Sequence, residues 1–272
     1  MLNLIRNLYQ SRTLLMTLAW KNVALRYKQS FLGIFWALLK PLCLMVIFSI
    51  VRSFVGIKSG DIPYSVLVFT ALMPWMFFQE STSEGVVSVT GNTALIRKVY
   101  FPREIFPVIA VGTKIIGLGL NLMIVLLLMA WHHIPLGLQA LWVPVLVLYV
   151  SLASLSVAFF GAALNVYYRD VAQALPIALS LLMYLSPILY PLHLVKEKLL
   201  VQEIAGPFSE WYYRLYSVNP LVGTIDAFQK VLLHNEPPDF ASMLPSAFVL
   251  LVLFPLSYAY FKRAERYFSD VI

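Results

Sequence analysis

Long apolar stretches alternate with short polar segments along this chain. A helix that spans a membrane needs about 20 mostly apolar residues, and six stretches reach that length. They cover residues 34–55, 63–82, 105–131, 140–166, 171–192 and 243–261. The pattern predicts an all-α integral membrane protein with six transmembrane helices, built as a single domain over residues 1–272.

Two further segments are too polar to span. Residues 1–30 carry apolar side chains within one arc of a helix, which predicts an N-terminal amphipathic interface helix. These side chains are Leu4, Leu8, Leu15, Leu18 and Ala19. Residues 193–242 include the aromatic-rich stretch EWYYRLYSVNPLVGTIDAFQKVLL, which predicts one or two short re-entrant or interfacial helices between spans five and six. A plain loop with an interfacial belt of aromatic residues is the alternative.

The composition agrees with a membrane protein. The 272 residues are 60% hydrophobic and only 12% charged, whereas about 25% of an ordinary soluble domain is charged. A single cysteine, Cys43, excludes an internal disulfide. No histidine or cysteine cluster has the spacing of a metal site, so we expect no bound metal.

The basic residues predict the orientation. Of the 20 lysines and arginines, twelve fall in the terminal segments and in the loops on the same side, and six fall on the other side. Cytoplasmic segments carry the excess of positive charge. Both termini are therefore expected in the cytoplasm.

The sequence contains none of three common motifs of nucleotide-binding proteins, hydrolases and metalloproteases. The chain has no GxxxxGK[ST] phosphate-binding loop, no GxSxG turn and no HExxH pair. Glu80 and Glu84 lie near the inner end of span two, and no carboxylate lies at mid-span. We therefore expect the chain itself to be no enzyme, and any transport to be powered from elsewhere.

One tight basic cluster lies between spans two and three. In GNTALIRKVYFPRE, residues 91–104, Pro102 directs the chain into the third span, and the preceding residues are long enough for a short helix on the cytoplasmic surface. The cluster could hold headgroup phosphates as an anchor. It could instead be a contact surface for a cytosolic partner.

Two lysines lie inside predicted spans. An ionised group there usually faces a cavity or a partner. Lys40 either reaches back to the cytosolic headgroups or meets an anionic group that enters a channel. Lys114 lies deeper, near Gly112, Gly117 and Gly119, which predict a close approach of helices.

Aromatic residues gather in spans one, two and five. They include Trp36, Trp75, Phe77, Phe78, Tyr184 and Tyr190. Aromatic faces can bind sugar rings, although an interface belt with ordinary helix packing explains each residue singly.

Five motifs, in order and over nearly the whole chain, resemble one family. They are LRYKQSFLGIFWALLKPL (25–42), NTALIRKVYFPREIFPV (92–108), NVYYRDVAQALPIAL (165–179), LSPILYP (185–191) and NPL (219–221). Together they resemble the permease subunit of ABC-2 type exporters of polysaccharides such as O-antigen. Lys40 departs from the family pattern, in which a neutral amide is more usual.

The resemblance implies a homodimer in the bacterial plasma (inner) membrane, with two copies of a separate ATPase that holds ATP and Mg. The substrate would be a lipid-linked polysaccharide, and no nucleic acid is expected. The implied ATPase-coupling residues are Asn92, Leu95, Ile96, Arg97, Lys98, Arg103, Arg169 and Asp170. The implied channel or substrate residues are Arg26, Lys28, Trp36, Lys40, Trp75, Phe78, Tyr184 and Tyr190.

Two other functions remain open at this point. One is an ABC-2 exporter of a drug or a small lipid. The other is a membrane-embedded glycosyl or acyl transferase, which would need a carboxylate or histidine near the membrane surface. Asp61, Asp170 and Asp226 are the isolated candidates for such a group.

Overall fold

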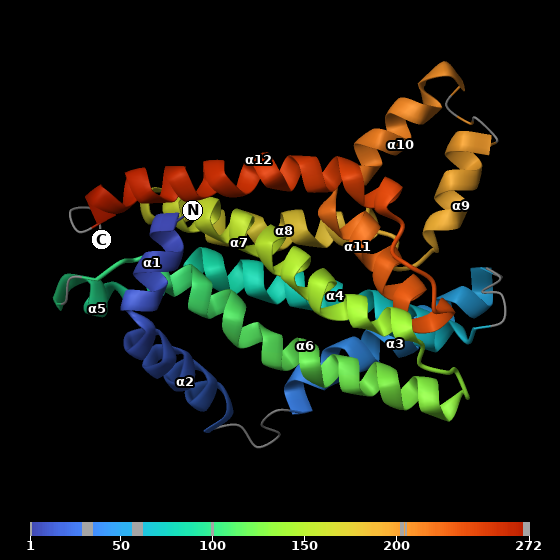
Figure 1. Cartoon of the computed structure of the whole chain (residues 1–272), viewed down its shortest axis with the longest axis horizontal. Coiled ribbons are helices and arrows are strands. Elements are labelled where there is room, and N and C mark those ends of the chain that lie inside the picture. The colour runs from blue at the N-terminus through green and yellow to red at the C-terminus, as the bar shows by residue number, and fades with distance from the viewer. Residues whose placement is uncertain are drawn as a thin grey trace.

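The computed structural model describes residues 2–28, 35–55, 62–98, 101–201, 204 and 206–268, and within these it contains helices and no strand. The expected all-α class is confirmed. Six long helices follow the long axis of the molecule (Figure 1). They are α3 (Trp36–Val55), α4 (Tyr64–Val87), α6 (Ile105–Trp131), α7 (Val143–Tyr167), α8 (Val171–Tyr184) and α12 (Phe240–Ala264). Each lies within or closely overlaps a predicted span.

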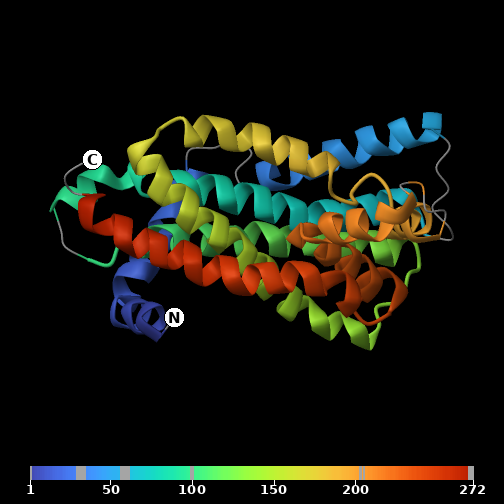
Figure 2. The same ribbon diagram turned by 90° about the horizontal axis from the view of Figure 1, so that it is seen from above.

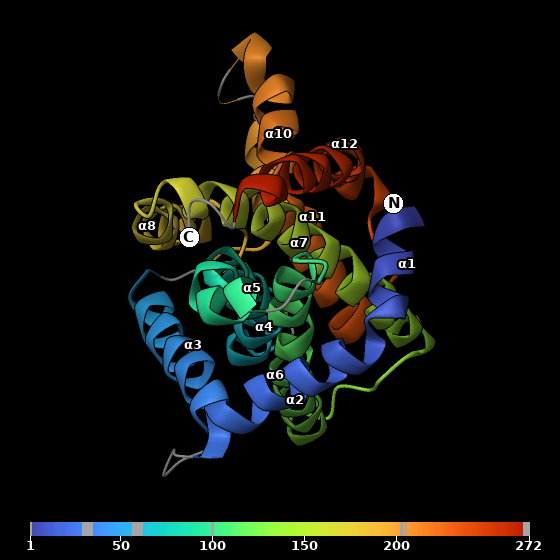
Figure 3. The ribbon, with the colours of Figure 1, turned by 90° about the vertical axis from the view of Figure 1, so that its left-hand side faces the viewer.

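Helix α4 is the centre of the bundle. It packs against α3, α6, α7 and α8, and the end-on view places it among them (Figure 3). Nearly every side chain between Tyr64 and Phe78 is buried. A helix that is apolar on all sides is stable only when other elements surround it, which explains this position.

Three helical stretches are long and apolar enough to cross a membrane. They are Ile105–Trp131, Leu138–Tyr167 and Phe240–Tyr267. Their surfaces carry many exposed leucine, isoleucine and phenylalanine side chains, and water would disfavour such surfaces. The chain is therefore a multi-pass membrane protein.

The fifth predicted span is shorter than expected. Helix α8 ends at Tyr184, and residues 185–191 form turns around Pro187 instead of completing the helix to residue 192. Fourteen residues extend about 21 Å, which is less than a hydrocarbon layer of about 30 Å. Within α8 only Leu179 is buried, and α8 lies along one edge of the bundle near α3 (Figure 2).

The N-terminal segment forms two helices, α1 (Leu2–Gln10) and α2 (Arg12–Lys28), with a turn at Ser11. They cross the end of the bundle at which both termini lie (Figures 1 and 3). Leu14, Leu15 and Leu18 pack against the core, whereas Met16 and Trp20 are exposed. Polar and apolar side chains are thus less sharply divided than the sequence pattern predicts.

The segment between α8 and α12 is helical, so the alternative of a plain loop is wrong. It contains α9 (Leu192–Lys196), α10 (Ser209–Ser217) and α11 (Pro220–Gln229). Helices α9 and α10 project from the end of the molecule opposite the termini (Figure 1). Helix α11 is buried against α4, α7 and α12, as a re-entrant helix would be.

Glycines bring α4 and α7 together at the end near the termini. A methyl group added to Gly85 would lie 2.5 Å from the Ala158 side chain, and one added to Gly161 would lie 2.5 Å from Val86. The expectation for the glycines near Lys114 is wrong within the protomer. A methyl group on Gly112, Gly117 or Gly119 would meet no atom within 4 Å among the described residues.

Candidate functional site

The basic cluster forms a short helix at the end of the molecule that carries the termini. A 3-10 turn (Thr90–Asn92) follows α4 and leads into α5 (Thr93–Lys98). The Asn92 amide donates a hydrogen bond of 2.8 Å to the Ser88 carbonyl and fastens the turn to the end of α4. We call residues 90–98 the coupling segment, after the role that the family resemblance implies for them.

The coupling segment has a buried side and an exposed side. Ile96 is buried and Leu95 half-buried, so they anchor α5 to the bundle. Arg97 and Lys98 are exposed. A cationic face held on a short, anchored helix suits contact with a cytosolic protein.

Arg103 is half-buried and contacts the residues that follow α12. Its backbone N–H donates a 2.8 Å hydrogen bond to the Glu265 carboxylate, and its guanidinium donates to the Glu265 carbonyl. The guanidinium also lies 5.9 Å from the centre of the Phe268 ring. Arg103 therefore joins the start of α6 to the end of α12, and its coupling role stays a prediction.

Arg169 and Asp170 are exposed in the loop between α7 and α8. A cleft of about 450 Å³ lies between this loop and the coupling segment, with Thr90, Thr93 and Arg169 in its lining. The structure thus brings the two predicted contact loops together on one surface.

Sequence reasoning missed the residue that joins these loops. Asn165 is 2% exposed, and its amide nitrogen donates to the Thr90 hydroxyl at 3.0 Å and to the Val86 carbonyl at 3.4 Å. Its amide oxygen accepts from the Ala172 N–H at 3.2 Å. An amide in the last turn of an apolar helix is a signal that would have singled it out, because buried polar groups need partners.

A second missed residue is Glu104, which is fully buried at the start of α6. Its carboxylate accepts hydrogen bonds from Lys262 at 2.7 Å, Asn7 at 2.8 Å and Tyr258 at 3.4 Å. Glu104 therefore ties α1 and α12 to the segment that follows the coupling segment.

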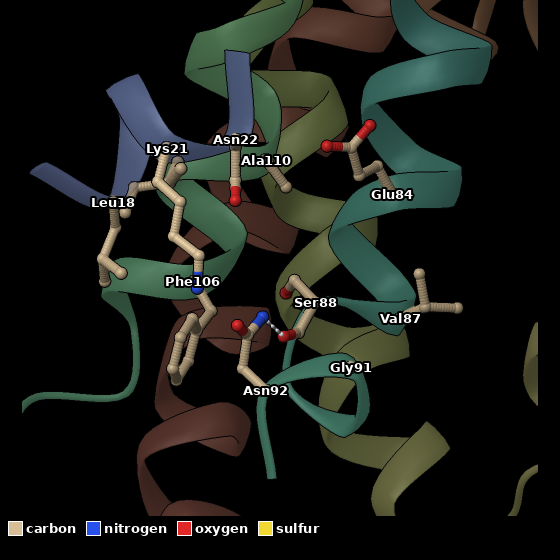
Figure 4. A pocket seen from close by; sticks show the side chains of 11 residues that line it. Leu18, Lys21, Asn22, Glu84, Val87, Ser88, Gly91, Asn92, Phe106 and Ala110 are labelled. Atoms are coloured by element: carbon tan, nitrogen blue, oxygen red, sulfur yellow. Dashed lines mark hydrogen bonds between the residues drawn. The ribbon is translucent and has the colours of Figure 1, made fainter. Parts of the chain in front are cut away.

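A polar pocket of about 580 Å³ lies between α2, α4 and α6 (Figure 4). Lys21, Asn22, Glu84 and Asn92 line it together with apolar side chains such as Phe106. In the close-up these polar groups point toward one space from opposite helices. Helix α2 and the coupling segment therefore line the same polar pocket.

Lys114 finds its partners on α4. Its ammonium lies 2.9 Å from the Glu80 carboxylate and 3.0 Å from that of Glu84, and its side chain is 11% exposed. Glu80 and Glu84 are four residues apart and so share one face of α4. The costly lysine in the third span is thus neutralised within the protomer and needs no external anion.

Two of the aromatic channel candidates are in the wrong place. Trp75 and Phe78 are 0% and 3% exposed, and their ring centres lie 6.4 Å apart inside the bundle. Because α4 is surrounded on all sides, neither can contact a substrate in this conformation. They are core residues.

Other channel candidates are accessible. Tyr184 is 64% exposed at the end of α8, and the Tyr190 hydroxyl donates to the Tyr184 carbonyl at 3.3 Å. Lys40 is exposed, and its ammonium donates to Gln79 at 3.3 Å. The side chains of Arg26, Lys28 and Trp36 lie outside the described part of the structure.

A charged cluster lies at the end of the molecule opposite the termini. Lys196 of α9 pairs with Asp239, which begins α12, and Lys230 lies 3.8 Å from Asp239 and 3.4 Å from Asp226. Asp239 also accepts hydrogen bonds from Ser242 at 2.7 Å and from the Ala241 N–H. Partial burial raises the pKa of Asp239, but Lys196, Ser242 and Lys230 lower it further, to about 2.

Comparison with known proteins gives a consistent result. The family model described as ABC-2 type transporter matches residues 13–233. The O-antigen export system permease protein RfbA of Myxococcus xanthus is 29% identical over 274 residues, with 100% of each chain covered. An RfbA of Klebsiella pneumoniae is 24% identical over 95% of each chain. The polysialic acid transport protein KpsM of Escherichia coli is 22% identical over 90% of this chain and 91% of its own.

Proposed function

Because the chain belongs to the ABC-2 type transporter family, we propose that it is the membrane subunit of an ATP-driven exporter of lipid-linked polysaccharide, with O-antigen as the first choice. The observation that carries this proposal is full-length similarity to a permease whose name states O-antigen export. A relative named for transport of polysialic acid, also a polysaccharide, supports the substrate class.

In the proposed topology the chain crosses a bacterial inner membrane six times and both termini lie in the cytoplasm. The six spans are α3, α4, α6, α7, α8 and α12. The basic residues of the terminal segments and of α5 support this orientation, since they lie at one end of the bundle. Helix α8 is short for a span, and the turns at 185–191 would complete the crossing. Helices α1 and α2 would lie at the cytosolic interface.

The energy would come from two copies of a separate ATPase that bind ATP and Mg beneath a permease homodimer. The exposed Arg97 and Lys98 and the exposed Arg169–Asp170 loop support a docking surface made of two adjacent loops. Closure of the ATPase pair would move the coupling segment, and α4 would carry the movement into the bundle.

The translocation path would lie along α3 and α8, whose surfaces the protomer leaves uncovered. Lys40 at its cytosolic end suits the diphosphate of a lipid carrier. Tyr184 and Tyr190 at its outer end suit sugar rings. Helices α9 and α10 would act as an outer gate.

The experiment is removal of the gene from its native cell, followed by location of the lipid-linked polysaccharide. Finished polymer that builds up in the cytoplasm and disappears from the surface is the expected result, and restoration by the intact gene is the control. Normal surface polymer would favour an exporter of a drug or small lipid. Absence of polymer everywhere would favour an enzyme of synthesis.

A further inference from the structure

The two cytoplasmic loops of the proposed docking surface are joined by a single buried amide. Asn165, in the last turn of α7, reaches the Thr90 hydroxyl at 3.0 Å and the Val86 carbonyl at 3.4 Å. On its other side it accepts from the Ala172 N–H at 3.2 Å. One side chain therefore contacts the end of α4, the start of the coupling segment and the start of α8.

The orientation of this amide is determined by its partners. The Val86 carbonyl can only accept a hydrogen bond and the Ala172 N–H can only donate one, so the amide nitrogen must face α4 and the oxygen must face α8. The Thr90 hydroxyl donates to the Val87 carbonyl at 3.2 Å and remains able to accept from Asn165. Asparagine satisfies all of these groups at once.

Ala172 is the second residue of α8, where N–H groups lack partners within the helix. Asp170, the residue before α8, makes no side-chain hydrogen bond that caps the helix. Asn165 supplies that bond from the preceding helix. The Ala172 N–H also donates to the Arg169 carbonyl of the preceding loop at 3.3 Å. The start of α8 is thus attached both to its own loop and, through Asn165, to the coupling segment.

Helix α8 is otherwise held weakly. Only Leu179 among its fourteen residues is buried, and α4 and α7 are the long helices that it contacts. A helix with few packed side chains can tilt at small cost, because few contacts have to break. Its attachment at the cytoplasmic end then determines how it moves.

We propose that Asn165 is a positioning residue that transmits movement of the coupling segment to α8. This role rests on the function proposed above, in which the ATPase moves residues 90–98 and α8 borders the path. When the segment moves, the Thr90–Asn165–Ala172 chain of hydrogen bonds moves the start of α8 with it.

The test replaces each end of this chain separately. Thr90→Val keeps the shape of the side chain and removes the hydroxyl that Asn165 contacts. Asn165→Asp keeps the oxygen that accepts from Ala172 and removes the donor that faces α4. Thr82→Val is the matched control, because it makes the same change in α4, outside residues 90–98, and the buried Thr82 hydroxyl has no hydrogen-bond partner among the described residues.

The permease, purified with its ATPase, is reconstituted in liposomes, and polymer translocated per ATP hydrolysed is measured. We expect Thr90→Val to lower that ratio about tenfold, with the rate of ATP hydrolysis changed less than about twofold. Asn165→Asp should lower it at least as much, and Thr82→Val should leave it unchanged. A wild-type ratio in Thr90→Val would overturn the proposal.

A second measurement does not depend on the substrate. Hydrogen–deuterium exchange is compared with and without a non-hydrolysable ATP analogue. In the wild type, nucleotide should change exchange in residues 90–98 and in the first turns of α8 together, whereas in Thr90→Val it should change only residues 90–98. An equal response of α8 in both proteins would overturn the proposal. If the wild type responds but moves no polysaccharide, the proposed substrate fails and this inference stands.

Discussion

The buried carboxylate of Glu104 joins several elements at the end of the bundle that carries the termini. It is fully buried and receives hydrogen bonds from three residues of two helices, Asn7 of α1 and Tyr258 and Lys262 of α12. A buried charge without a partner is strongly unfavourable, and breaking such a pair by removing one member costs about 3–5 kcal/mol. Lys262 is about one-third exposed, so solvent will reduce that value.

Glu104→Ala should therefore lower the free energy of unfolding by about 2–3 kcal/mol. Thermal unfolding of the purified protein in detergent measures this change. Glu210→Ala is the control, because Glu210 and Arg214 form a pair whose side chains are 71% exposed and such pairs contribute about 0.3–0.5 kcal/mol. Equal shifts of the thermal midpoint in the two variants would show that the hydrogen bonds of Glu104 do not stabilise the fold.

Ion pairs between residues far apart in the chain are the feature that the sequence predicts least well. The sequence shows that Lys114 lies within a span and that Glu80 and Glu84 lie near the inner end of another. It does not show that the lysine pairs with the two carboxylates. The span predicted over 63–82 puts both carboxylates near the membrane surface and Lys114 deeper, so the sequence does not predict the ion pairs. Helix α4 continues to Val87, and this brings Glu80 and Glu84 to the level of Lys114. The burial of Trp75 could not be predicted either, because an aromatic residue in a span can face lipid, a channel or the core.

At the scale of elements, α4 and α7 are held together by small residues. Gly85 lies against Ala158 and Gly161 against Val86, so the helix backbones approach closely at the end of the bundle near the termini. Close approach increases van der Waals contact, which stabilises helix pairs where the hydrophobic effect is absent. This contact supports the end of α4 from which the coupling segment begins.

Gly85→Ala should weaken this packing, because the new methyl group would lie 2.5 Å from the Ala158 side chain. Overpacking of this kind costs about 1–3 kcal/mol. The thermal midpoint should fall, whereas Gly112→Ala, whose methyl group meets no described atom within 4 Å, should leave it unchanged or raise it. If the thermal midpoint fell equally in Gly85→Ala and Gly112→Ala, the cause would be the alanine in a helix and not the contact with Ala158.

Helix α9, whose Leu192 is buried, is also held to the start of α12 by the ion pair of Lys196 with Asp239. Partial burial raises the pKa of Asp239, but the stronger effect of Lys196, Ser242 and Lys230 lowers it to about 2. The ionised form is thus favoured by the fold. Its stabilisation is fully present above the pKa of about 3.9 expected for an unfolded aspartate and is lost as the pH falls through about 2.

Exchange of the amides of α9 and α10 should therefore be independent of pH, after correction for intrinsic rates, from pH 8 down to about 4. It should increase below that. Asp239→Asn should give fast exchange already at pH 7, and Glu197→Gln on the same outer segment serves as the control. Fast exchange in the control, or slow exchange in Asp239→Asn, would mean that this carboxylate does not hold the outer helices.

Element-level predictions from the hydrophobic pattern were good where apolar runs are long. Helices α3, α4, α6, α7 and α12 begin and end close to the predicted residues. Helix α8 ended early because the turns at 185–191 around Pro187 follow Tyr184 directly, and composition alone did not reveal that. The N-terminal helix was expected to be continuous, whereas a turn at Ser11 divides it.

At the scale of the whole molecule, a charged surface at the end with the termini and a charged cluster at the opposite end are joined by an apolar bundle. The exposed faces of α3 and α8 are mostly apolar, and in the proposed homodimer a second copy would complete the path along them. In the proposed function, ATP hydrolysis at one end drives polymer movement along these faces, with the coupling segment as the link.

The most direct measurement of that link is ATP-dependent translocation of lipid-linked polysaccharide by the reconstituted permease–ATPase complex, with wild type beside Arg97→Ala/Lys98→Ala. We predict that the wild type moves polymer only with ATP. The double variant should bind its ATPase and hydrolyse ATP but move polymer at least about tenfold more slowly. Wild-type translocation by the double variant would contradict the assignment of residues 90–98 as the coupling segment, and wild-type translocation without ATP would contradict the exporter itself.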